Sequence, residues 1–290
     1  MIIDVHVHAF PDKVAEKAIE TLSMTYGVKC FSDGKISSLI SNMRSFGIDV
    51  SIVQPVSTDP KQVISINTWI ASLNKKQEEE NDSQKYKPII GFGTIHPRFD
   101  DYHDEIHRMK ELGIKGVKFQ PSFQEFYPDD EKMFPIYEEL IKANMIIFFH
   151  AGDEIKPANI IYSTPKRLAR MLDTMQSTID QYDYRVKNSQ WTEFPSKIVA
   201  AHLGGYRMWD DVEEYLVGRE IYFDLSYVFG HIEFHRANKI IKSHGLNKIL
   251  YGSDFPFARQ EKDISEVMNL DISQEDKENI LSENFLRLYS

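Results

Sequence analysis

Two histidines near the start of the chain are the first residues whose type and spacing could do chemistry. His6 and His8 alternate with the β-branched residues of the segment at 2–7, and Asp4 continues the same spacing. On a β-strand, a period of two places these three polar side chains on one face. Two imidazoles at this spacing can bind one metal ion, and buried polar groups need such partners. A half-exposed edge strand that carries its histidines by chance explains the segment equally well, so the rest of the chain must decide.

Further ionisable residues lie at or just after the ends of later apolar segments. Four of them have this position: Lys118, His150, His202 and Asp254. Each one taken alone is also typical of an ordinary buried residue with a hydrogen-bonded partner. Their common position at segment ends gives them weight together, because it suggests that one structural edge collects them.

The elements that must position these residues alternate along the chain. Strands are expected at 2–7, 50–55, 87–95, 114–119, 145–149, 197–201, 220–225 and 248–251. Helices are expected at 11–26, 36–46, 59–80, 99–112, 129–143, 164–182, 209–217 and 233–244, with further helical patterns from about 264 and at 274–288. Such alternation predicts a parallel sheet covered by helices, and eight βα units match a closed (β/α)8 TIM barrel.

The whole chain, 1–290, is expected to form this single barrel domain. An open doubly wound sheet is the alternative, but no Gly-rich phosphate-binding turn follows the first strand. In a barrel, the carboxyl ends of the strands share the face that carries catalysis. We therefore expect the four later residues to meet His6 and His8 at one mouth of the barrel.

Neutral imidazoles and a carboxylate are ligands for zinc and also for iron, cobalt or manganese. We expect His6, His8, His150 and Asp254 to hold a divalent cation, with one position left for water. Such an ion lowers the pKa of its water toward neutrality. Asp254 is the expected proton acceptor, and His202 is expected to orient the water or polarise a substrate carbonyl.

Short motifs in this order resemble those of the amidohydrolase superfamily. They are His-Val-His at 6–8, Gly-Val-Lys-Phe at 116–119, Phe-His-Ala-Gly at 149–152, Ala-His-Leu-Gly-Gly at 201–205 and Tyr-Gly-Ser-Asp-Phe-Pro at 251–256. More narrowly they are similar to the amidohydrolase-related branch that includes aminocarboxymuconate-semialdehyde decarboxylase. The closing segment, with Asn284 and Arg287 before Leu288, is similar to the terminal helix of that branch.

This resemblance implies a distorted barrel with a divalent-metal site. It implies His6, His8, His150 and Asp254 as ligands and His202 as the catalytic histidine. In binuclear relatives a lysine at the position of Lys118 is carboxylated and bridges two metals, with His150 and His202 on the second. We favour one ion, most simply Zn²⁺, and an unmodified Lys118 that faces substrate or pairs with a buried charge.

Several other residues are weaker candidates. Asp4 is expected either to fix the tautomer of a histidine or to bind backbone groups, and Asp224 is as easily structural as functional. Pocket-lining residues are expected after strand ends, and the long segment at 152–195 has the length of a lid. The remaining candidates are Tyr162, Trp191, Tyr206, Arg207, Phe255, Glu154, Lys156, His96 and His231.

Composition restricts the possible partners. A formal charge of −10 argues against nucleic-acid or anionic-membrane binding through bulk electrostatics. The single cysteine, Cys30, excludes an intrachain disulfide, and no apolar segment approaches the roughly 20 residues of a membrane-spanning helix. We expect a cytoplasmic protein with no targeting segment before Met1 and with a small molecule as its partner. A homodimer is compatible with the resemblance.

The expected function is metal-dependent hydrolysis of an ester, lactone or amide carbonyl in a small, carboxylated molecule. A non-oxidative carboxy-lyase acting on an aromatic or enoic acid is the alternative from another reaction class. Both would use the same ligands, so the substrate pocket must separate them. A metal-binding protein without catalysis is the third possibility.

Overall fold

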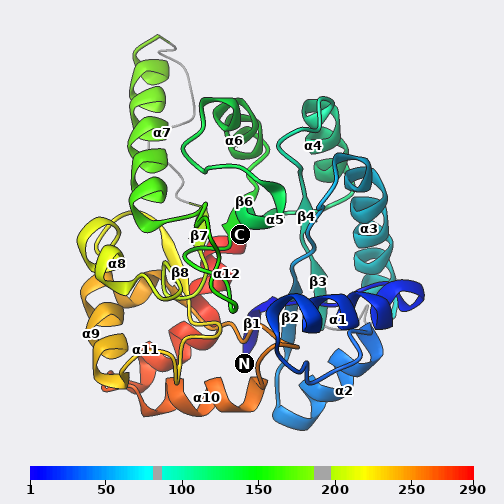
Figure 1. Ribbon diagram of the computed structural model, residues 1–290, viewed down its shortest axis with the longest axis vertical. Helices are drawn as coiled ribbons and strands as arrows, with labels where there is room; N and C mark the ends of the chain where they lie inside the picture. Colours follow the sequence, from blue (N-terminus) through cyan, green and yellow to red (C-terminus); the bar gives the residue numbers. More distant parts are fainter. Residues whose placement is uncertain (81–86, 186–196) are drawn as a thin grey trace.

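Parallel strands surrounded by helices form the framework of the computed structural model, which describes residues 1–80, 87–185 and 197–290 (Figure 1). Every predicted strand is present, and the third is divided at Phe92 into two. The strands are β1 (Ile3–Val7), β2 (Val50–Val53), β3 (Ile89–Gly91), β4 (Gly93–Thr94), β5 (Gly116–Phe119), β6 (Ile146–Phe149), β7 (Ile198–Ala200), β8 (Tyr222–Asp224) and β9 (Ile249–Leu250).

The helices begin and end close to the predicted positions. Gly27 and Gly47 end the first two with φ of 69°, a conformation that glycine adopts without strain. The helices are α1 (Asp12–Tyr26), α2 (Ile36–Phe46), α3 (Val63–Glu80), α4 (Tyr102–Glu111), α5 (Pro121–Gln124), α6 (Phe134–Lys142), α7 (Pro165–Arg185), α8 (Trp209–Tyr215), α9 (Phe234–His244), α10 (Gln260–Asn269), α11 (Gln274–Glu278) and α12 (Asn284–Tyr289). The short α5 was not expected from the sequence. None of the helices in the described ranges is long and apolar enough to span a lipid bilayer.

The strands pair in parallel in the order of the chain. They form a sheet of three strands, β1-β2-β3, and a sheet of six, β4-β5-β6-β7-β8-β9. The last strand returns to the first, since the Val5 N–H donates to the Tyr251 carbonyl at 3.0 Å and Val7 forms an isolated parallel bridge with Phe255. The fold is therefore the predicted α/β barrel, distorted so that single hydrogen bonds rather than a continuous ladder join its first and last strands.

Alternation along the strands divides the core into two parts. In β6, Ile146 and Phe148 face an inner cluster, and Ile147 and Phe149 face the outer cluster beneath the helices. The inner cluster also contains Phe285 and Leu288 from the C-terminal turns, together with residues from the starts of several strands. These side chains cover the end where the strands begin, and the opposite end is left for the functional residues.

Candidate active site

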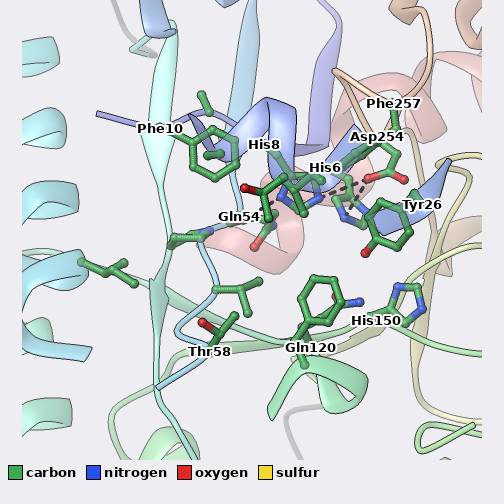
Figure 2. Close-up of a pocket in the computed structure, with 18 of the residues that line it drawn as sticks. His6, His8, Phe10, Tyr26, Gln54, Thr58, Gln120, His150, Asp254 and Phe257 are labelled. Atoms are coloured by element: carbon green, nitrogen blue, oxygen red, sulfur yellow. Dashed lines mark hydrogen bonds and ion pairs between the residues drawn. The ribbon is translucent and has the colours of Figure 1, made fainter. Parts of the chain in front are cut away.

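The residues singled out in the sequence converge where the strands end. The His8 Nε2 and His6 Nε2 atoms lie 3.2 and 3.6 Å from Asp254 Oδ1. Lys118 Nζ lies 3.1 Å from His6 Nε2, so β5 reaches the same point. Figure 2 shows His6, His8 and Asp254 together at the cavity wall, with His150 set apart from them. The convergence expected of the barrel is thus present for segments from both ends of the chain.

Asp4 does not share a role with the two histidines. The pairing register of β1 with β2 shifts between Asp4 and Val7, as at a β-bulge. The Asp4 carboxylate accepts hydrogen bonds from the Ser253 N–H and Oγ and from Gln260 Nε2 in α10. The simple alternation predicted for this strand is therefore wrong at Asp4, which binds the segment after β9 instead of an imidazole.

Hydrogen-bond acceptors fix the tautomers of His6 and His8. The His6 Nδ1–H donates to Asp224 Oδ2 at 2.7 Å, and the His8 Nδ1–H donates to the Gln54 carbonyl at 2.9 Å. In each ring the Nε2 atom is therefore the unprotonated one, and it faces the carboxylate of Asp254. The Lys118 ammonium lies 3.1 Å from His6 Nε2, but the lone pair of His8 Nε2 faces the carboxylate and repels it unless a cation lies between them.

His150 and His202 have the same arrangement one strand apart. The His150 Nε2–H donates to the Asp153 carbonyl at 3.1 Å, and the His202 Nδ1–H donates to the Ser226 carbonyl at 2.8 Å. This leaves His150 Nδ1 and His202 Nε2 unprotonated and 3.0 Å apart. A bound proton or a cation is needed to stabilise this contact as well.

The donor set fits a divalent ion. Two ligands that are each about 2.1 Å from one ion lie about 3.0–3.4 Å apart at the usual coordination angles. The separations of the His6, His8 and Asp254 atoms are close to this range. Among the described residues these three form one triad of possible ligands, in which only His8 is partly exposed, and His6, His202 and Asp224 form a fully buried second triad. His150 belongs to neither triad, so its expected place among the ligands stays a prediction.

Burial keeps the imidazoles of His6 and His150 neutral. Burial, with the Lys118 charge, lowers the pKa of His6 to about 3, and burial lowers the pKa of His150 to about 4. Burial also lowers the pKa of Lys118 to about 8. Burial raises the pKa of Asp254, but the neighbouring histidines outweigh it, so the net shift is downward. Neutral rings beside an ionised carboxylate are the protonation states that metal ligation requires.

The backbone is strained at two of these residues. His202 and Asp254 have φ of 60° and 65°, a left-handed conformation uncommon for residues with a Cβ. The Asp224 carboxylate supports the first of them by accepting the His202 N–H at 2.8 Å. Gly152, with φ of 86°, packs directly on the backbone of Tyr206, which ties the segment after β6 to that after β7.

A cavity of about 650 Å³ opens over this cluster. Its lining includes the four histidines and Asp254, and of the weaker candidates it includes Glu154 and Tyr206. Trp191 lies outside the described residues. Among the residues that the structure describes, the lining does not include the candidates Tyr162, Arg207, Phe255, Lys156, His96 and His231.

Sequence reasoning missed several residues that shape the site. Gln54 and Ser226 act through backbone carbonyls, which any residue type supplies, so no sequence signal marks them. The position of Asp224 late in a predicted strand is the signal that marks it in the sequence. Tyr26 and Gln120 also line the cavity, but both occur in segments that read as ordinary helix or loop.

A separate group of possible ligands lies on the surface. His103 and His107 of α4 face Glu139 of α6, with Nε2–Oε2 distances of 3.6 and 3.9 Å. Both rings are exposed, and none of the three residues lines the cavity. Any measurement of bound metal must therefore distinguish this group from the buried cluster.

Comparison with known proteins places this geometry in context. The chain matches the amidohydrolase family over residues 3–290. No protein with curated annotation matches it.

Solved structures share its fold at low sequence identity. A probable 2-pyrone-4,6-dicarboxylic acid hydrolase from Acinetobacter baumannii is 16% identical, with a TM-score of 0.63 over 99% of this chain and 98% of that one. A 2,6-dihydroxybenzoate decarboxylase from Rhizobium is 13% identical, with a TM-score of 0.64 over 99% and 98%. A 5-carboxyvanillate decarboxylase from Novosphingobium aromaticivorans, complexed with manganese, is 16% identical, with a TM-score of 0.65 over 100% and 96%.

Proposed function

The chain belongs to the amidohydrolase family, and from that membership we propose that it is a metal-dependent hydrolase of an ester, lactone or amide carbonyl. The observation that carries the proposal is the convergence of unprotonated His6 Nε2 and His8 Nε2 on the Asp254 carboxylate inside a barrel mouth. We propose these three residues and His150 as ligands of one Zn²⁺ ion. A carboxylated substrate, a homodimer and a cytoplasmic location stay predictions from the sequence.

A divalent ion at this site would supply an activated water and polarise the substrate carbonyl. The chain's own groups then do the remaining work. Asp254 is ionised, so its carboxylate can accept a proton from water and return it to the leaving group. His202 presents an unprotonated Nε2 whose direction is fixed by the Ser226 carbonyl, and it can orient water or the substrate oxygen.

Lys118 has a positioning role in this proposal. Its ammonium group is fully buried and lies 3.1 Å from His6 Nε2, with the carboxylates of Asp224 and Asp254 raising its pKa against burial. We propose that Lys118 is unmodified and balances the charge of these carboxylates. A carboxylated Lys118 bridging two ions, with His150 and His202 on the second, is the alternative.

A carboxy-lyase is the second candidate function. Two of the three solved structures described above are decarboxylases, and one of these holds manganese. At this identity they support the fold alone, so the reaction class has to be measured. In this candidate, His202 would deliver a proton to the carbon that loses carbon dioxide.

The test is a parallel assay of the zinc- and manganese-loaded protein on lactones and on hydroxybenzoates. Acid release from lactones would support the hydrolase. Carbon dioxide release from hydroxybenzoates without lactone hydrolysis would refute the hydrolase and support the carboxy-lyase. His202→Asn should abolish turnover, while His231→Asn, an exposed histidine at the same end of the barrel, should keep it. A metal-loaded protein inactive on both panels would refute both enzymatic functions.

A further inference from the structure

The cavity extends from the histidine cluster toward two helices that face it with apolar side chains. Val14, Ala18 and Leu22 follow one another at four-residue spacing on α1, so they lie on one helix face, and all three line the cavity. Ile66 and Trp69, three residues apart, line it from α3. The three α1 side chains are partly or fully exposed. Ile66 and Trp69 are partly buried against the core and expose the rest of their surface.

This exposure has a physical consequence. Apolar side chains that face water are stabilised when something removes them from it, and a contiguous apolar lining in a concave site is typical of a ligand-binding surface. The only α1 residue that is fully buried is Ala15. The apolar stripe of α1 therefore serves the cavity more than it serves the core.

Away from the proposed metal site and the buried Lys118 behind it, positive charge is scarce in this cavity. Lys17, an exposed residue of α1, is the one lysine or arginine among the described lining residues. Arg207 is nearby, but its guanidinium lies over the Tyr206 ring at 4.9 Å and within 4.0 Å of Asp153. Recognition of a compact carboxylate usually uses arginine, because its two parallel N–H groups match the two oxygens.

Negative charge is present instead. Glu154 lines the cavity beside the histidines, where its Oε1 accepts a hydrogen bond from Gln120 Nε2 at 3.1 Å. A second anionic group placed against this wall would meet repulsion without a cationic partner. The lining thus disfavours small di- and tricarboxylates and favours an uncharged, extended molecule.

We propose that the substrate is an elongated, uncharged ester, lactone or amide whose apolar tail lies between α1 and α3 while its carbonyl faces the histidine cluster. This inference rests on the proposed hydrolytic site for the position of the carbonyl. It proposes an uncharged substrate in place of the carboxylated one expected from the sequence, because the side chains of the cavity wall, rather than the metal ligands, would bind the tail.

The test is calorimetric titration of the metal-loaded protein with 5-alkyl-2-pyrrolidinones, uncharged lactams that hydrolyse slowly. Extending the alkyl chain from two to six carbons should tighten binding by up to about fourfold per methylene, the factor that full burial of a methylene gives. Benzene-1,3-dicarboxylate should bind more weakly than the six-carbon lactam. Affinity that is independent of chain length, or tighter binding of the dicarboxylate, overturns the proposal.

Matched variants locate the tail. Ile66→Asn should weaken binding of the six-carbon lactam at least tenfold and reduce the dependence of affinity on chain length. Ile64→Asn on the same helix should leave both quantities unchanged, because Ile64 is 45% exposed and lies outside the lining. Val14→Asn gives a second cavity variant that does not depend on core packing, since Val14 is 48% exposed. Equal affinities in the cavity variants and the control overturn the assignment.

Turnover of the matching γ-lactones is measured separately. Chain-length-dependent lactam binding without lactone hydrolysis would refute the proposed function and leave the tail site supported. Hydrolysis at a rate independent of chain length would support the proposed function and overturn the inference.

Discussion

Replacing Asp224 by Asn tests how the site fixes its ligands. The Oδ1 atom of Asp224 accepts hydrogen bonds from the His202 N–H and from the Ser226 N–H and hydroxyl. Its Oδ2 atom accepts only the His6 Nδ1–H, at 2.7 Å. Asn has nearly the same shape and keeps the Oδ1 bonds, but it places an NH₂ group where Oδ2 was.

Two N–H donors would then face each other. The new NH₂ donor favours an unprotonated His6 Nδ1, although the Ser226 hydroxyl lies 2.9 Å from that atom, and this moves the proton to Nε2, the atom directed at Asp254. A protonated Nε2 cannot ligate a metal. Loss of such an orienting carboxylate typically reduces metal affinity by about 10- to 100-fold, equivalent to about 1.4–2.7 kcal/mol. We expect Asp224→Asn to fall in this range.

The assay is competition for Zn²⁺ with a chromophoric chelator, with Asp4→Asn as the matched control. Asp4 is as completely buried as Asp224 and burial raises its pKa to about 6, but its carboxylate binds Ser253 and Gln260 and not an imidazole ring. Asp4→Asn should lower stability and keep zinc affinity within about twofold. Equal zinc affinities in Asp224→Asn and the unsubstituted protein would refute the assigned tautomer.

The remaining predictions concern packing, pH and charge. Gly152→Ala should lower the free energy of unfolding by at least about 2 kcal/mol in chemical denaturation, because the added Cβ would overlap the Tyr206 backbone. Gly218→Ala is the control: Gly218 has φ of 83° and no atom within 4 Å of an added Cβ, so the loss should be only about 1 kcal/mol. Equal losses in the two variants would contradict this. Burial lowers the pKa of His244 to about 4 from its ordinary 6.5, so the unfolded chain binds more protons between these values and stability falls as pH falls through them. His244→Gln should therefore remove about 2 kcal/mol of the stability difference between pH 7 and pH 5, and an unchanged difference would rule out this residue as the cause. Lys118→Met should keep the metal content of the unsubstituted protein, measured by elemental analysis; a loss of half the metal would indicate a carboxylated, bridging lysine.

The fold was predictable because the strands that build it are apolar on both faces. The run Ile146–Phe149 reads as a buried parallel strand because Ile147 and Phe149 face the helices while Ile146 and Phe148 fill the barrel. The division of the third strand at Phe92 was not predictable, since the segment is as apolar there as elsewhere. Where ladders stop depends on how the barrel is distorted, and that is a property of all its strands together.

The site was predictable to the extent that strand ends determine it. His6, His8 and Asp254 come together because their segments all reach one end of the barrel. The tautomer-fixing groups are mostly backbone carbonyls and were invisible in the sequence. Of the two roles expected for Asp4, it binds backbone groups such as the Ser253 N–H, and Asp224 fixes the tautomer of His6. A local register shift in β1 changes the direction of side chains that strict alternation would place together.

The central claim is that His6, His8 and Asp254 hold a divalent ion, and anomalous diffraction at the zinc absorption edge from zinc-loaded crystals tests it most directly. We predict a peak about 2.0–2.2 Å from His6 Nε2, His8 Nε2 and an Asp254 carboxylate oxygen. A peak confined to the surface group of His103, His107 and Glu139, with none at the buried histidines, would contradict it.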